Sequence, residues 1–258
     1  MDAEGGAMIA VIVVAAGSGE RLGYGMAKAK VPLGGEPMLS HTLRGVLASG
    51  VAGQICVAVP RGDAELRGLC EALGAGTGDG PVVTVVDGGA TRAASVRAAL
   101  VAVQPGVTAV LIQDAARPLT PAEVYHRVAG ALAAGALAVI PALAVTDTVK
   151  SVEPAQSRGA GIAAEVVRAT PDRARLRSVQ TPQGFDLPTL RRAYESAAGL
   201  TAEQTAAVTD DAMLVEAAGV DVYVVKGSAS SLKITGPWDL LLAEALLAGP
   251  LAPRWVEG

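Results

Sequence analysis

The sequence predicts a Rossmann-like three-layer α/β/α fold, in which a mostly parallel sheet lies between two layers of helices. Short, almost wholly apolar runs alternate with segments of helical length along the first 145 residues. Runs that are apolar on both faces are typical of strands covered on both sides. The regular alternation of strand and helix favours parallel pairing, with crossover helices on both faces of the sheet.

The strands of this sheet are expected where the apolar runs end in turn residues. In chain order they are Ile9–Ala16, Gln54–Pro60, Val82–Val86, Val107–Ile112 and Leu137–Val145. The alternating helices are expected at Pro37–Ser49, Asp63–Leu73, Thr91–Val103 and Pro121–Ala134. The first of these begins with a proline and is followed by Gly50, which are typical helix boundaries.

The pattern changes between residues 146 and 180. Thr146–Val152 and Ile162–Arg168 alternate polar and apolar residues, and the Pro/Gly/Ser-rich Glu153–Gly161 separates them. This predicts a β-hairpin that projects from the sheet. Because a two-stranded hairpin alone is only marginally stable, we expect the 146–180 arm to form a homodimer. A surface ribbon without a partner is the alternative.

The C-terminal part continues with helices and two further strands. Helices are expected at Leu187–Ala197, Thr209–Ala218 and Pro237–Leu247, and strands at Val222–Lys226 and Leu232–Ile234. Leu251–Gly258 is expected to be a frayed tail. We expect residues 1–258 to form a single domain that carries the 146–180 arm.

Composition narrows the function classes. The net charge of −4 argues against a nucleic-acid-binding protein, which normally carries a basic surplus. Two cysteines, Cys56 and Cys70, are too few for a disulfide framework and suggest reduced thiols in a cytoplasmic protein. The acidic first residues do not resemble a signal peptide. The uncharged segment Val128–Val145 contains Gly130, Gly135 and Pro141, so a membrane span is not expected.

A glycine-rich, cationic loop follows the first strand and predicts a phosphate site. Residues 17–25 contain four glycines, and Arg21, Lys28 and Lys30 lie in or just after them. Glycines let backbone N–H groups approach a ligand, and the cations neutralise phosphate charge. The spacing matches neither the P-loop nor the dinucleotide fingerprint. The glycines alone are equally compatible with an ordinary strand-to-helix loop.

Other polar residues also follow expected strands. Gly88 and Gly89 precede a helix, and Asp114 ends the fourth strand. The carboxyl ends of parallel strands meet at one edge, where such sheets bind ligands. The arm carries a cluster of arginines at 168, 173, 175 and 177, which suits a phosphorylated acceptor. Lys233 lies between apolar residues, which is costly unless its side chain faces a polar site.

Three phrases of the sequence carry a family resemblance. AAGSGERL at 15–22, with Lys28 and PLGGEPML at 32–39, resembles the signature of nucleotidyltransferases that activate sugar and alditol phosphates. DAARP at 114–118 and VQTPQGF at 179–185 resemble the cytidylyltransferases of that family that act on methylerythritol phosphate. The resemblance implies the nucleotidyltransferase fold. It also implies transfer of the cytidylyl group of CTP to methylerythritol phosphate, with Mg²⁺ and release of pyrophosphate, in non-mevalonate isoprenoid precursor synthesis.

Two alternatives to this function remain. The enzyme could use ribitol 5-phosphate as the acceptor, or the protein could be a nucleotide-binding dimer without catalytic turnover. The second is kept open because this family normally has a proline before the catalytic lysine, where this chain has Ala27. The same departure leaves Lys30 as an alternative to Lys28.

The resemblance also implies roles for individual residues. The catalytic residues would be Arg21 and Lys28. CTP would be bound by Ala15, Ala16, Gly17, Ser18, Gly19, Gly89 and Ser95. The acceptor would be bound by Asp114, Arg117, Thr148, Arg173, Thr181 and Lys233, with Asp114 also holding the metal. Thr148 and Arg173 would reach a neighbouring subunit's site. We interpret Asp210 and Asp211, at an expected helix start, as caps.

Overall fold

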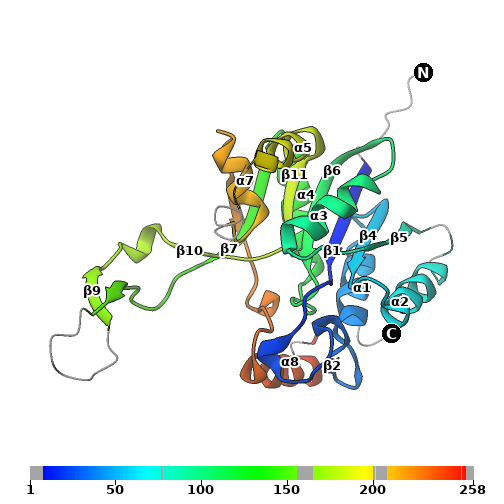
Figure 1. Ribbon diagram of the computed structural model, residues 1–258, viewed down its shortest axis with the longest axis horizontal. Coiled ribbons are helices and arrows are strands. Elements are labelled where there is room, and N and C mark those ends of the chain that lie inside the picture. Colours follow the sequence, from blue (N-terminus) through cyan, green and yellow to red (C-terminus); the bar gives the residue numbers. More distant parts are fainter. Residues whose placement is uncertain are drawn as a thin grey trace.

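The computed structural model describes residues 8–76, 78, 80–155, 165–199, 201, 208–250 and 252–253. Most of its strands belong to one central sheet (Figure 1). These strands are β1 (Met8–Val14), β4 (Gln54–Val59), β5 (Val82–Asp87), β6 (Val107–Asp114), β7 (Ala138–Ala144), β10 (Arg177–Val179), β11 (Gln183–Asp186) and β12 (Tyr223–Lys226).

The sheet is mostly parallel, as predicted. Its order is β10-β7-β11-β6-β1-β4-β5, with β12 also paired to β7. β1 pairs in parallel with both β4 and β6, and β12 with β7. β11 runs antiparallel between β6 and β7. The sequence did not predict β11, because this strand is short and contains Gly184. A Cβ on Gly184 would lie 2.4 Å from Val128, so this glycine lets α4 pack closely on β11.

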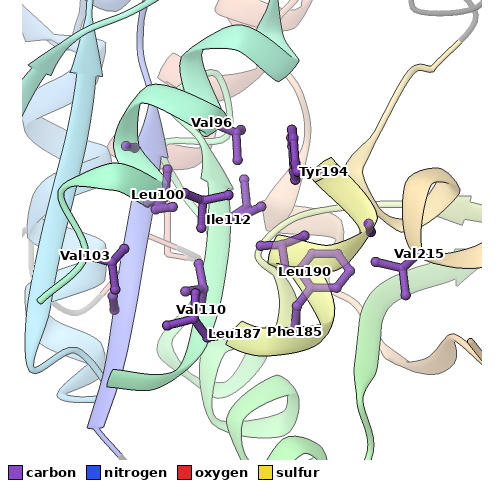
Figure 2. Close-up of a cluster of buried hydrophobic side chains, with 14 of the residues drawn as sticks. Val96, Leu100, Val103, Val110, Ile112, Phe185, Leu187, Leu190, Tyr194 and Val215 are labelled. Carbon is purple, nitrogen blue, oxygen red and sulfur yellow. The ribbon is translucent and has the colours of Figure 1, made fainter. Parts of the chain in front are cut away.

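Helices cover both faces of the sheet, which confirms the three-layer prediction. They are α1 (Met38–Ser49), α2 (Ala64–Ala75), α3 (Arg92–Val101), α4 (Ala122–Ala133), α5 (Leu187–Ser196), α7 (Asp211–Ala217) and α8 (Pro237–Ala248). Alternate residues of each strand face opposite layers. Ile12 and Ile112 pack with α3, α5 and α7 (Figure 2). Val11 and Leu111 pack on the other face with α1, α2 and α4.

A third, smaller apolar cluster supports the loop side of the sheet. It joins α8 to the short hairpin of β2 (Pro32–Leu33) and β3 (Glu36–Pro37). Ile234 is buried in this cluster, and its backbone N–H donates to Ala116 O at 2.8 Å. The prediction of a strand at Leu232–Ile234 is wrong, because this segment forms that single bond and no ladder.

The predicted hairpin is present within the described residues. β8 (Ser151–Pro154) pairs antiparallel with β9 (Glu165–Ala169), and the arm extends away from the body of the protein (Figure 1). β8 starts later than the predicted Thr146, at Ser151. Four valines of the arm are exposed: Val149, Val152, Val166 and Val167. Residues 156–164, with most of the predicted Glu153–Gly161 loop, lie outside the described part.

Two further predictions concern the ends of the chain and the membrane. The expected tail Leu251–Gly258 lies almost wholly outside the described residues. None of the helices in the described part combines the length and the apolar character that crossing a membrane requires.

Candidate active site

A cavity of about 840 Å³ opens at the carboxyl ends of β1 and β6, the edge at which the sequence predicts a ligand. Its walls come from the loop after β1, from the turn before α3 and from the segment before α8. The lining includes eleven of the predicted site residues: Ala15, Ala16, Gly17, Ser18, Gly19, Arg21, Lys28, Gly89, Ser95, Asp114 and Lys233.

The loop after β1 folds tightly around Gly19. This residue has φ +75°, a left-handed conformation that favours glycine. A Cβ here would lie 3.0 Å from the backbone of Lys28, so the close approach also requires glycine. Lys28 N–H donates to Gly17 O at 3.0 Å and closes the loop. The glycines therefore hold Lys28 close to the part of the loop that the sequence predicts to bind phosphate.

Lys28 and Lys30 face different surroundings. Lys28 lines the cavity, where burial, together with the charges of Lys233 and Arg21, lowers its pKa to about 8. Lys30 lies 2.9 Å from both Asp63 and Glu65 at the start of α2, and it does not line this cavity within the described residues. This geometry favours Lys28 as the cation that meets a ligand.

The lowered pKa of Lys28 predicts a pH dependence of CTP binding. The ammonium attracts a triphosphate, and in the free protein it loses its proton above pH 8. We expect CTP affinity to fall about tenfold between pH 7 and pH 9, because binding then requires Lys28 to regain a proton. Titration calorimetry across this range would measure it. An equal fall in Lys28→Met would contradict the assignment, because this variant has no amine to titrate.

Ala27 adopts the backbone conformation that the family's proline would impose. Its φ of −55° and ψ of 135° lie in the range that proline prefers. We therefore expect Ala27→Pro to raise the free energy of unfolding by about 0.4–1 kcal/mol, through the unfolded chain, and to keep activity. Thermal unfolding with a parallel activity assay would test this. A lower unfolding temperature would show that proline does not fit the loop.

Hydrogen bonds made by the side chain of Ser95 stabilise the turn before α3. Ser95 is buried, and its Oγ accepts from Gly89 N–H at 3.1 Å and donates to Thr91 O at 3.0 Å. A Cβ on Gly88 would lie 2.4 Å from Ala16, so only glycine lets this turn approach the β1 loop. The geometry gives Ser95 a role in shaping the turn, and a direct contact with CTP stays a prediction.

Asp114, at the end of β6, is a buried carboxylate that lines the cavity. Its Oδ2 lies 2.7 Å from Lys233 Nζ, and its Oδ1 lies 3.2 Å from Arg92 Nε. Burial alone would raise the pKa of Asp114, but the charges of Arg92 and Lys233 outweigh it and lower the pKa to about 2. The carboxylate is therefore ionised at neutral pH.

A second cavity of about 200 Å³ adjoins the first at Asp114 and contains Arg117 and Thr181. Arg117 donates to Ser231 O and Val179 O at 2.6 and 3.2 Å, and its buried Nε has no partner among the described atoms. Thr181 Oγ1 accepts from Asp114 N–H at 3.0 Å. Thr181 thus holds the end of β6, and Arg117 joins the segment after β6 to β10 and to Ser231. The contact of both residues with an acceptor stays a prediction.

The two arm residues lie apart from these cavities. Arg173 donates to Thr146 O at 2.7 Å and joins the two sides of the arm at its base. Neither Thr148 nor Arg173 lines either cavity in the part of the chain that the structure describes.

Sequence reasoning missed one of the two ion-pair partners of Asp114, which is Arg92. Arg92, the first residue of α3, lines both cavities and also contacts Asp211 Oδ2 at 2.5 Å. Asp210 caps α7 by accepting from Met213 N–H, as interpreted from the sequence. Asp211 is instead a buried ion-pair partner. The available signal for Arg92 was its position directly after the glycine turn at 88–91, and no signal in the sequence indicated its pairing with Asp211.

Comparison with known proteins decides the family. The model of the IspD family, 2-C-methyl-D-erythritol 4-phosphate cytidylyltransferase, matches residues 9–249. The chain belongs to this family. Its relatives include the Streptomyces avermitilis cytidylyltransferase, 48% identical over 94% of this chain and 93% of that protein. The Nocardia farcinica cytidylyltransferase is also 48% identical, over 95% of this chain and 96% of the relative.

Solved structures of IspD proteins share the fold. The synthase from Anaerococcus prevotii has a TM-score of 0.75 at 29% identity and covers 95% of this chain and all of its own. The Thermus thermophilus cytidylyltransferase has a TM-score of 0.70 at 34% identity, over 93% of this chain and 98% of its own. The expected cytidylyltransferase family and nucleotidyltransferase fold are thus confirmed.

Proposed function

We propose that this IspD-family enzyme transfers the cytidylyl group of CTP to 2-C-methyl-D-erythritol 4-phosphate. An oxygen of the acceptor's phosphate attacks the α-phosphorus of CTP, and the bond from that phosphorus to the bridging oxygen breaks. The products are 4-diphosphocytidyl-2-C-methyl-D-erythritol and pyrophosphate. The family match along nearly the whole chain carries this proposal.

Charge stabilisation supplies the catalysis in this proposal. Attack at phosphorus increases negative charge on the oxygens around it, and fixed cations stabilise that state more than the bound substrate. Arg21 and Lys28 line the cavity beside the glycine loop and would face the triphosphate. Because the attacking phosphate is already anionic, positioning and charge neutralisation suffice without a strong general base.

Asp114 suits a Mg²⁺ ion held jointly with substrate phosphates. Its carboxylate is ionised and faces the cavity. No group of three acidic, histidine or cysteine side chains that could hold a metal occurs among the described residues. The proposed Mg²⁺ site would be built from one carboxylate, water and phosphate oxygens. When bound, Mg²⁺ would neutralise charge on the phosphates of CTP.

The remaining roles follow from position. The backbone of residues 15–19 and Gly89 would bind the nucleotide, with Ser95 supporting the turn. The adjoining cavity with Arg117, Thr181 and Lys233 would take the acceptor. The exposed valines of the arm support a homodimer in which Thr148 and Arg173 complete the partner's site. We also propose that residues 1–258 form a single domain, which the central sheet supports. The buried free thiols of Cys56 and Cys70 support a reducing compartment, the cytoplasm.

Identification of the nucleotide product tests the proposed reaction. Incubation with CTP, Mg²⁺ and methylerythritol phosphate should give a new diphosphate diester by ³¹P NMR, together with pyrophosphate. UTP in place of CTP serves as the control for the base. Formation of a mononucleotide and pyrophosphate without the diester would indicate hydrolysis of CTP and contradict cytidylyl transfer.

A further inference from the structure

Arg92 joins the turn that lines the CTP cavity to the carboxylate at the end of β6. It is the first residue of α3 and directly follows the turn at 88–91. Its Nε lies 3.2 Å from Asp114 Oδ1, and its Nη1 lies 2.5 Å from Asp211 Oδ2. One guanidinium therefore connects residues that are 22 and 119 positions away in the sequence.

Asp211 is buried, and both of its carboxylate oxygens have partners. It is the first residue of α7, and its side chain is 1% exposed. Its second oxygen, Oδ1, accepts from the hydroxyl of Tyr194 on α5 at 2.5 Å. Tyr194 belongs to the apolar cluster beneath α3 and α5 (Figure 2). Asp211, Arg92 and Asp114 thus form a chain of contacts from this core to the cavity.

This arrangement does not suit a phosphate-binding arginine. Asp211 neutralises the guanidinium, and two of its donors are already directed at carboxylates. Burying the Asp211 carboxylate would be costly without a paired cation. The planar guanidinium instead fixes the orientation of Asp114. In metal sites, groups that do not contact the metal often orient its ligands through hydrogen bonds in the same way.

We infer that Arg92, anchored by Asp211 and Tyr194, is a positioning residue that orients Asp114 toward the Mg²⁺ of bound CTP. The inference rests on the proposed function, because Asp114 is the proposed metal ligand. Arg92 holds Oδ1, while Oδ2 contacts the more exposed Lys233. The carboxylate is thereby held in one orientation, and Lys233 is the cation that the metal would displace from it.

Metal-dependent CTP binding tests this role apart from turnover. Calorimetry would give the CTP dissociation constant of each protein with Mg²⁺ and with EDTA. In Arg92→Lys we expect the gain in CTP affinity from Mg²⁺ to fall at least about tenfold, as for other residues that orient metal ligands. Affinity in EDTA should stay within about threefold, because Arg92 does not contact the phosphates in this account.

Two further variants separate positioning from a general structural effect. Tyr194→Phe removes only the hydroxyl that anchors Asp211, and it should reduce the Mg²⁺-dependent gain in the same direction by a smaller factor. Arg97→Lys is the matched control, because Arg97 is exposed on the same helix, 5.8 Å from the ring of Tyr194, and does not line the cavity. It should behave as wild type.

The outcomes distinguish this inference from the proposed function. An unchanged Mg²⁺-dependent gain in Arg92→Lys would overturn the positioning role. An equal loss of CTP affinity in EDTA would also overturn it, by showing that Arg92 binds the nucleotide directly. If wild type binds CTP equally well with Mg²⁺ and with EDTA, the proposed metal site itself is wrong.

Discussion

Replacing Lys28 with alanine is expected to lower kcat by about 10²–10³-fold, the loss typical when one preorganised charge-stabilising donor is removed. Lys28 lines the cavity, and its pKa of about 8 reflects burial near Lys233 and Arg21. Removing it from the free protein relieves repulsion between cations, so the fold should be kept. Single-turnover kinetics at saturating CTP would isolate the chemical step.

Lys30→Ala is the matched control for this prediction. Lys30 has the same side chain two residues away, but its ammonium pairs with Asp63 and Glu65 at the start of α2. Because Lys30 does not line the cavity, kcat should change less than about threefold. A large loss in Lys30→Ala together with near-normal turnover in Lys28→Ala would reverse the assignment.

The second large effect concerns the arm. If Arg173 binds the acceptor in the partner's site, Arg173→Ala should lower kcat/KM by about 10²-fold, as expected for loss of a charged contact. Arg21→Ala should be equally impaired, although Arg21 lies in the chain's own cavity. Each homodimer would then lack one half of both of its sites.

A mixed dimer should recover activity only if the sites are shared. Co-expression with two affinity tags would give heterodimers of Arg21→Ala and Arg173→Ala chains. One site then combines an intact cavity with an intact arm, so about half of wild-type activity is expected for a symmetric dimer. Heterodimers as inactive as both parents would show that Arg173 acts within its own chain or has another role.

The sequence was most informative where local rules decide the structure. Buried strands, glycine turns and the Asp114 strand end are encoded within a few residues, and the rule that parallel strands end at one edge brought them into one site.

What the sequence did not predict depends on contacts between distant elements. The Arg92–Asp211 pair spans 119 positions, and nothing near Asp211 marks it as a buried ion-pair partner rather than a cap. β11 was missed because Gly184, an unfavourable strand residue, is required by packing against Val128 on α4. Leu232–Ile234 was wrongly predicted as a strand, since Ile234 is buried in the apolar cluster with α8 and not by a neighbouring strand.

The reaction itself can be tested most directly by pyrophosphate release with CTP and Mg²⁺, with methylerythritol phosphate and ribitol 5-phosphate offered in parallel. Our account predicts rapid release with methylerythritol phosphate and none above background with ribitol 5-phosphate. Release with ribitol 5-phosphate alone would contradict the proposed acceptor. Release with neither would contradict catalysis of this transfer.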